Sequence, residues 1–89
     1  MENNIIIELE EYLNKMKQKE IRISQIGFIM NQFFINKMTY VIQNDILSLQ
    51  DETKNIYLSL NLNQAYQIEI GENNMSLFLD NDTEIQISI

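Results

Sequence analysis

The spacing at which apolar residues recur along the chain changes once, from three or four residues to two. This change constrains the fold more than any other feature of the sequence. Over residues 3–19 apolar residues recur every three or four positions, as on one face of an amphipathic helix. They are Ile5, Leu9, Tyr12 and Met16, with Ile6 and Leu13 beside them. From residue 46 onward apolar and polar residues alternate, as in half-buried strands. The sequence therefore predicts an N-terminal helix followed by a run of strands.

Turn residues divide the alternating region into short segments. Their apolar positions are Leu47 and Leu49; Ile56, Leu58 and Leu60; Tyr66, Ile68 and Ile70; Met75, Leu77 and Leu79; and Ile85, Ile87 and Ile89. Strands this close in sequence favour antiparallel pairing, because parallel neighbours need longer crossovers. We predict an α+β fold, with the N-terminal helix or helices packed on one face of an antiparallel β-sheet (meander), in one domain over residues 1–89. The opposite face is expected to carry Tyr57, Ser59, Gln67, Glu69, Ser76, Phe78, Glu84, Gln86 and Ser88.

Residues 24–43 fit the helical and the strand pattern alike. A helical stripe can follow a cap at Ser24, formed by Ile26, Ile29, Met30, Phe33 and Phe34. A strand is also compatible with Ile21, Ile23 and Phe28. We favour a helix over residues 24–35, in which Gly27 would cost about 1 kcal/mol against Ala. Residues 38–43 lean towards a strand because they are rich in β-branched and aromatic side chains.

The sequence contains neither His nor Cys, and their absence excludes whole classes of chemistry. Ser–His and Cys–His catalysis, disulfides, and zinc sites with imidazole or thiolate ligands all need these residues. Asp80, Asp82 and Glu84 have the spacing of the first ligands of a calcium loop, but Ile85 stands where that loop needs Gly. A Gly-rich phosphate loop is excluded because the chain has only two glycines. We therefore expect no metal, no cofactor and no enzymatic activity.

The net charge of −7 belongs entirely to the strand-rich part of the chain. Residues 1–37 contain five basic and five acidic side chains, whereas residues 38–89 contain eight acidic side chains and only one basic one, Lys54. A field of one sign steers partners of the other sign, such as a nucleic-acid-binding protein. Net charge also improves the solubility of a small protein whatever its partner. The acidity of this chain can therefore be explained by solubility alone.

Aromatic and acidic residues share the predicted polar face of the sheet, and this combination is typical of interfaces. We predict a protein-binding surface in which Tyr57 and Phe78 act as anchors. The acids that would steer a basic partner are Glu69, Asp80, Asp82 and Glu84. Either aromatic residue can instead belong to the core.

In its small size, lack of catalytic side chains and concentrated acidity, the chain resembles small phage-encoded inhibitors of host defence, especially anti-CRISPR proteins. This resemblance is compositional and covers no motif, so it assigns no residue a role. It implies a stoichiometric binder that occupies a basic nucleic-acid channel of a CRISPR effector or blocks its conformational change. No apolar run approaches the roughly 18 residues that span a bilayer. We expect no membrane association and a cytoplasmic location, in the host cell if the protein is phage-encoded.

Two other functions fit parts of the sequence. A structural or assembly subunit can form homo-oligomers if the C-terminal strand, residues 84–89, pairs with another chain. A winged-helix nucleic-acid-binding protein is the second alternative, since residues 20–27, EIRISQIG, look like the start of a helix in LOTUS-type winged-helix domains. That fold would need residues 38–43 to form the recognition helix. Direct nucleic-acid binding is disfavoured because this segment carries no Lys or Arg.

Overall fold

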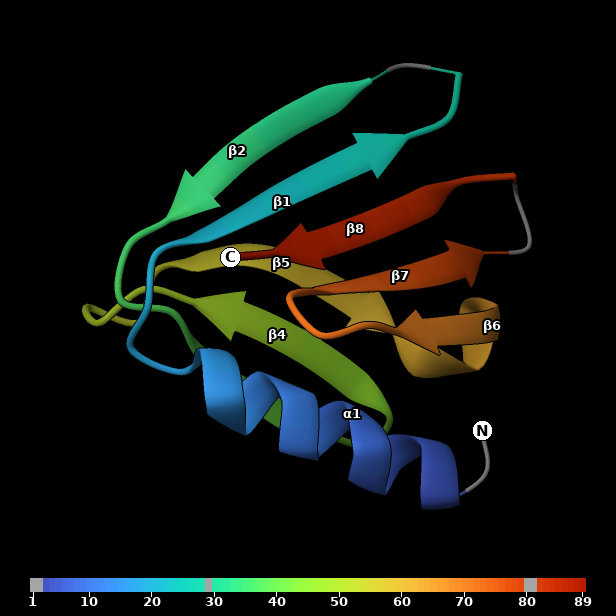
Figure 1. Cartoon of the computed structure of the whole chain (residues 1–89), viewed down its shortest axis with the longest axis horizontal. Coiled ribbons are helices and arrows are strands. Elements are labelled where there is room, and N and C mark those ends of the chain that lie inside the picture. Colours follow the sequence, from blue (N-terminus) through green and yellow to red (C-terminus); the bar gives the residue numbers. More distant parts are fainter. Residues whose placement is uncertain (1–2, 29, 80–81) are drawn as a thin grey trace.

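Among the residues that the structure describes, one long helix precedes eight strands (Figure 1). The computed structural model describes residues 3–28, 30–79 and 82–89. In chain order the elements are α1 (Asn3–Met16), β1 (Ile21–Ile26), β2 (Asn31–Ile35), β3 (Thr39–Gln43), β4 (Ile46–Gln50), β5 (Ile56–Asn61), the 3-10 helix η1 (Leu62–Gln64), β6 (Ala65–Ile70), β7 (Asn74–Leu79) and β8 (Glu84–Ser88). The predicted α+β fold with antiparallel, meander-like strands is confirmed.

The strands form two antiparallel sheets. The first has the order β2-β1-β8-β7-β6, and the second has the order β3-β4-β5. Strand β8 pairs with β1 on one side and with β7 on the other, so the last strand of the chain lies in the middle of its sheet. The hypothesis that residues 84–89 offer an edge to another chain is therefore wrong. The edges of the five-stranded sheet are β2 and β6.

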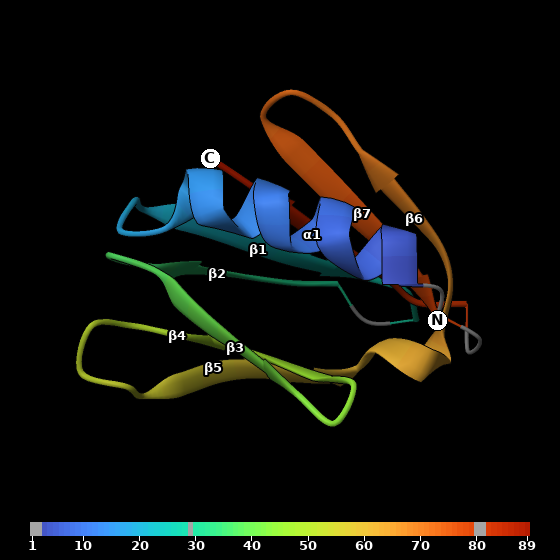
Figure 2. The same cartoon turned by 90° about the horizontal axis from the view of Figure 1, so that it is seen from below.

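Helix α1 is tied to both sheets. Figure 2 shows the three-stranded sheet below, with the helix and the five-stranded sheet above it. The hydroxyl of Tyr12 donates to the backbone oxygen of Ile87 in β8 at 3.3 Å, and the hydroxyl of Tyr40 in β3 donates to Asn14 Oδ1 at 2.8 Å. Burial raises the pKa of Tyr12 to about 12. The predicted helical stripe is buried at Leu9, Tyr12, Leu13 and Met16.

The buried apolar side chains form one cluster between the helix and the two sheets. The five-stranded sheet contributes Ile21, Ile23, Ile35, Met75, Leu77, Leu79, Ile85 and Ile87, and the three-stranded sheet contributes Leu47, Leu49 and Leu60. The predicted alternation is confirmed for β4, β7 and β8, while Ile89 lies beyond the end of β8 and is exposed. One face of the larger sheet is therefore apolar and buried, as expected for an antiparallel sheet with one solvated side.

Within the described part of the chain, a β-bulge shifts the alternation in β5 and another shifts it in β6. The β4–β5 register shifts at Leu49/Gln50, and the β6–β7 register shifts at Ala65/Gln67. Each bulge inserts an extra residue, which changes the side of the sheet that the neighbouring residues face. The apolar residues Ile56 and Tyr66, which were predicted to be buried, are exposed instead.

The helix predicted over residues 24–35 is wrong, because this segment contains the end of β1, a turn and β2. Ser24 pairs with Gln32 inside the β1–β2 hairpin and caps no helix. Ile23 and Phe33 face each other across this hairpin and pack inward. The segment therefore follows the two-residue alternation of a strand and not the spacing of a helix. Gly27 is at the turn, where an added Cβ would lie only 3.2 Å from Thr83 Oγ1 of the neighbouring turn.

The strand predicted over residues 38–43 is confirmed as β3. Asn44 and Asp45 both have positive φ, as a two-residue hairpin turn between β3 and β4 requires. Because β3 occupies the position of the recognition helix, the winged-helix alternative is wrong. The predicted hairpin of β4 and β5 is confirmed.

Candidate partner-binding surface

Most of the predicted polar face lies on the five-stranded sheet, and we call this part the outer face. Tyr57 and Ser59, which were predicted to share it, belong to β5 of the other sheet. Phe78 pairs with Gln67 on one side and with Glu84 on the other, while Ser76 pairs with Glu69 and with Gln86. Side chains that are paired in register lie on the same face of a sheet. The structure therefore brings together three of the predicted site residues, namely Glu69, Phe78 and Glu84.

Hydrogen bonds orient the carboxylates on the outer face. Gln67 Nε2 donates to Glu69 Oε1 at 2.9 Å, and Gln86 Nε2 donates to Glu84 Oε2 at 2.6 Å. Among the described residues of these five strands, Arg22 is the only basic side chain, and its Nε donates to Ser88 Oγ at 3.3 Å. The outer face is thus mildly acidic and otherwise built from amides and hydroxyls.

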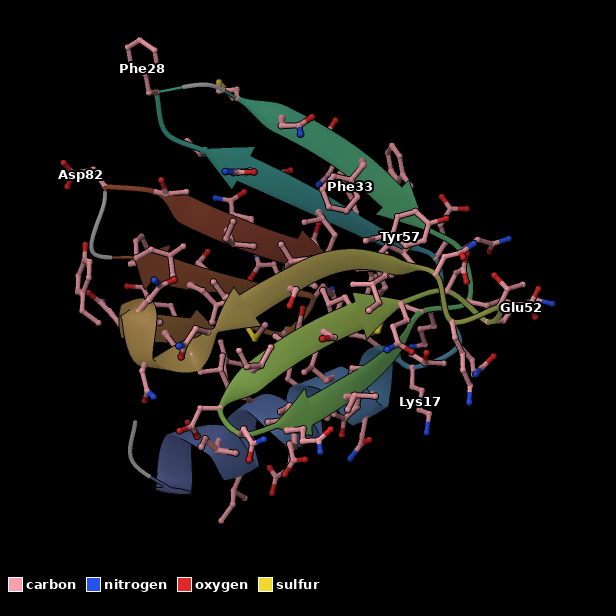
Figure 3. All side chains as sticks on the ribbon, turned by 180° about the vertical axis from the view of Figure 1, so that it is seen from behind. Lys17, Phe28, Phe33, Glu52, Tyr57 and Asp82 are labelled. Atoms are coloured by element: carbon pink, nitrogen blue, oxygen red, sulfur yellow. The ribbon has the colours of Figure 1, made fainter. Side chains whose placement is uncertain are left out.

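Tyr57 does not lie on the outer face, and its predicted grouping with Phe78 is wrong. It belongs to β5 of the three-stranded sheet, where its ring stacks on Phe33 at a centroid distance of 6.3 Å. Its hydroxyl donates to Asp51 Oδ2 at 3.1 Å, and this hydrogen bond raises the pKa of Tyr57. Tyr57 therefore joins the β4–β5 turn to β2, as Figure 3 shows for the neighbouring rings of Tyr57 and Phe33.

Asp51 organises the β4–β5 turn. Its Oδ1 accepts from Thr53 Oγ1 at 2.6 Å, from the Thr53 backbone N–H at 2.9 Å and from the Asn55 backbone N–H at 3.1 Å. These donors, with the Thr53 hydroxyl first, lower the pKa of Asp51 from 3.8 to about 2. The ionised carboxylate therefore stabilises the folded turn.

The lowered pKa of Asp51 predicts how stability depends on acidity. This contribution is fully present above the unfolded-state pKa of 3.8 and is lost as the pH falls through about 2. The melting temperature of the wild type should therefore fall more steeply between these values than that of Asp51→Asn, which cannot titrate. Thermal melts followed by circular dichroism across this range measure both slopes. Equal slopes in the two proteins would contradict the prediction.

Asp82 lies at the β7–β8 turn, beside the turn of the β1–β2 hairpin. Ile26 pairs with Glu84, and the Cβ position of Gly27 lies 3.7 Å from the backbone oxygen of Asp82. Figure 3 shows Phe28 and Asp82 at the same end of the molecule. The remaining predicted site residue, Asp80, lies outside the described residues.

Sequence reasoning missed the most exposed apolar side chains at this end. Phe28 is fully exposed, Met30 is 75% exposed, and Tyr66 is 66% exposed with its ring 6.4 Å from that of Phe78. The apolar residues of the sequence GFIM could have signalled Phe28 and Met30, because short hairpin turns are normally built from Gly, Asn, Asp and Ser. Met30 also lines a shallow hollow on the outer face together with Arg22, Ser24, Gln25, Ile26, Asn31, Gln32 and Gln86.

We call the group formed by Phe28, Met30, Asp82 and Glu84 the acidic tip. It combines a protruding aromatic ring with two carboxylates, an arrangement that can bind an apolar pocket rimmed by basic groups. Within residues 3–28, 30–79 and 82–89, no three acidic side chains gather as metal ligands would. No helix among these residues is long and apolar enough to cross a membrane.

Comparison with protein-family models finds no match. No curated protein and no solved structure matches the chain either.

Proposed function

We propose that this chain is a non-enzymatic inhibitor that binds a basic, nucleic-acid-binding protein through the acidic tip and the adjoining outer face. The observation that carries the proposal is the fully exposed ring of Phe28 on the β1–β2 turn, which lies beside the β7–β8 turn that contains Asp82. An exposed aromatic side chain contributes little to folding, whereas buried aromatic anchors dominate the energetics of interfaces.

The charge of the chain supports a basic partner. Residues 38–89 contain eight acidic side chains and only one basic side chain, Lys54. Three of these acids, Glu69, Asp82 and Glu84, border the proposed surface. Complementary charge speeds encounter and sets specificity more than it adds affinity. A CRISPR effector is the partner class we propose, because its nucleic-acid channel is basic and an acidic surface can compete for it.

The steering role of the acids is tested by neutralising them together. The triple variant Glu69→Gln, Asp82→Asn, Glu84→Gln should associate about tenfold more slowly with the partner, and added salt should slow it less than it slows the wild type. Partners are captured from host-cell lysate and identified by mass spectrometry. Purified CRISPR effectors are tested in parallel for loss of DNA cleavage. Association rates are then measured at low and high salt.

A second triple variant provides the matched control. Glu8→Gln, Glu11→Gln and Glu20→Gln change the net charge equally but lie at exposed positions in the first twenty residues. If the control slowed association as much as the surface variant, the net charge would be responsible rather than this surface. If neither variant changed association, the electrostatic part of the proposal would be wrong.

A further inference from the structure

Strand β2 is an edge of the five-stranded sheet. It pairs with β1 along one side in an unbroken register from Ile21↔Ile35 to Gln25↔Asn31, and no described strand pairs with its other side. Tyr57 of the second sheet stacks on Phe33 of β2, and this contact involves rings rather than strand pairing. An edge strand of this kind presents backbone N–H and C=O groups to any extended chain that reaches it.

The β2 edge also lacks the features that normally protect an edge. Natural sheets guard such strands with Lys, Pro, bulges or covering segments. Residues 23–36 contain no charged residue and no Pro, and the β1–β2 register has no bulge. This neutral stretch stands out in a chain with a net charge of −7. Two copies of the chain repel each other through their acidic surfaces but not through this edge.

We propose that β2 pairs antiparallel with β2 of a second copy, around a two-fold axis at Gln32. On the outer face this register places Met30 of each copy opposite Phe34 of the other. These side chains are 75% and 56% exposed in the single chain, and pairing covers both. The two Gln32 side chains then face each other at the axis, and a continuous ten-stranded sheet results.

A second copy suits this edge better than a basic partner does. The strand carries no acid that would select a basic segment, whereas a two-fold contact needs only a self-complementary surface. Pairing of one five-residue strand buries less than the roughly 1,200 Å² of a standard interface, so the dimer should dissociate on dilution. The dimer does not depend on the proposed inhibitory function.

Sedimentation velocity of the full chain tests the dimer directly. Over about 1 µM to 1 mM, the wild type should shift from monomer to dimer. Gln32→Lys places like charges opposite each other at the axis and should raise the dissociation constant about tenfold or more. The control is Gln43→Lys, an exposed residue on β3, the edge of the other sheet, and it should dimerise like the wild type. Circular dichroism is used to check that both variants are folded.

Engineered cysteines test the register, since the natural sequence has none. Gln32→Cys should cross-link to itself with a short bis-maleimide far more efficiently than Gln43→Cys at the same concentration. A wild type that stays monomeric at the highest concentration would overturn the proposal. So would a dimer that tolerates Gln32→Lys, a dimer lost only in Gln43→Lys, or equal cross-linking of the two cysteine variants.

Discussion

Leu77→Ala is expected to lower the free energy of unfolding by about 2–5 kcal/mol, the range found for buried Leu-to-Ala substitutions. Leu77 lies in the middle of β7, is fully buried, and is paired with Ile68 and Ile85 of the two neighbouring strands. Its removal leaves a cavity in the hydrophobic core that cannot close without moving the sheet. For a domain of this size, each kcal/mol lowers the melting temperature by about 4–8 °C, so the variant should melt at least about 8 °C lower.

Urea unfolding followed by circular dichroism measures this loss. The matched control is Ser76→Ala, one residue away on the outer face of the same strand, which should change stability by less than about 0.5 kcal/mol. The contrast between neighbouring residues tests which side of the sheet is buried. Equal losses in the two variants, or a Leu77→Ala variant as stable as the wild type, would contradict the described core.

The alternation of apolar residues was sufficient to predict the strands that bury one face along their whole length. In β7 every second residue is apolar, and Met75, Leu77 and Leu79 are all buried while the residues between them are not. A one-residue slip in this strand would expose Met75, Leu77 and Leu79 together, so the pattern fixes the buried face as well as the strand. The buried faces of β4 and β8 follow from alternation in the same way.

Local pattern failed where distant pairing decides the structure. Residues 24–35 carry both periods, and the strand form is selected because β1 also pairs with β8, more than fifty residues away in the sequence. Tertiary pairing of this kind overrides local propensity. The division into two sheets was not predictable for the same reason. No local pattern shows that β5 and β6, which follow each other in the sequence, belong to different sheets.

The candidate site was predictable where its residues share one sheet. Glu69, Phe78 and Glu84 follow the alternation of β6, β7 and β8, which pair in sequence order. Tyr57 could not be placed, because its position depends on a bulge in β5 and on a ring contact with β2. Phe28 was missed because its exposure depends on a hairpin that was interpreted as a helix.

Phe28→Ala is expected to weaken binding of the captured partner strongly while leaving the fold intact. The ring is fully exposed, so its removal takes no apolar area from the core and should not change the melting temperature. An aromatic side chain that anchors an interface costs about 2 kcal/mol or more on truncation, which corresponds to about 30-fold in the dissociation constant. The loss should appear mainly as faster dissociation.

Surface plasmon resonance with each captured partner measures association and dissociation rates. It thereby distinguishes the role of the Phe28 ring from the role of the surrounding acids. Ile56→Ala, which truncates a 61% exposed side chain on the other sheet, is the control and should bind like the wild type. Because the carboxylates act during encounter and the ring acts after docking, the acid-neutralised triple variant should change the association rate, whereas Phe28→Ala should change the dissociation rate. If Phe28→Ala dissociated no faster than Ile56→Ala, the partner would not be held by the acidic tip.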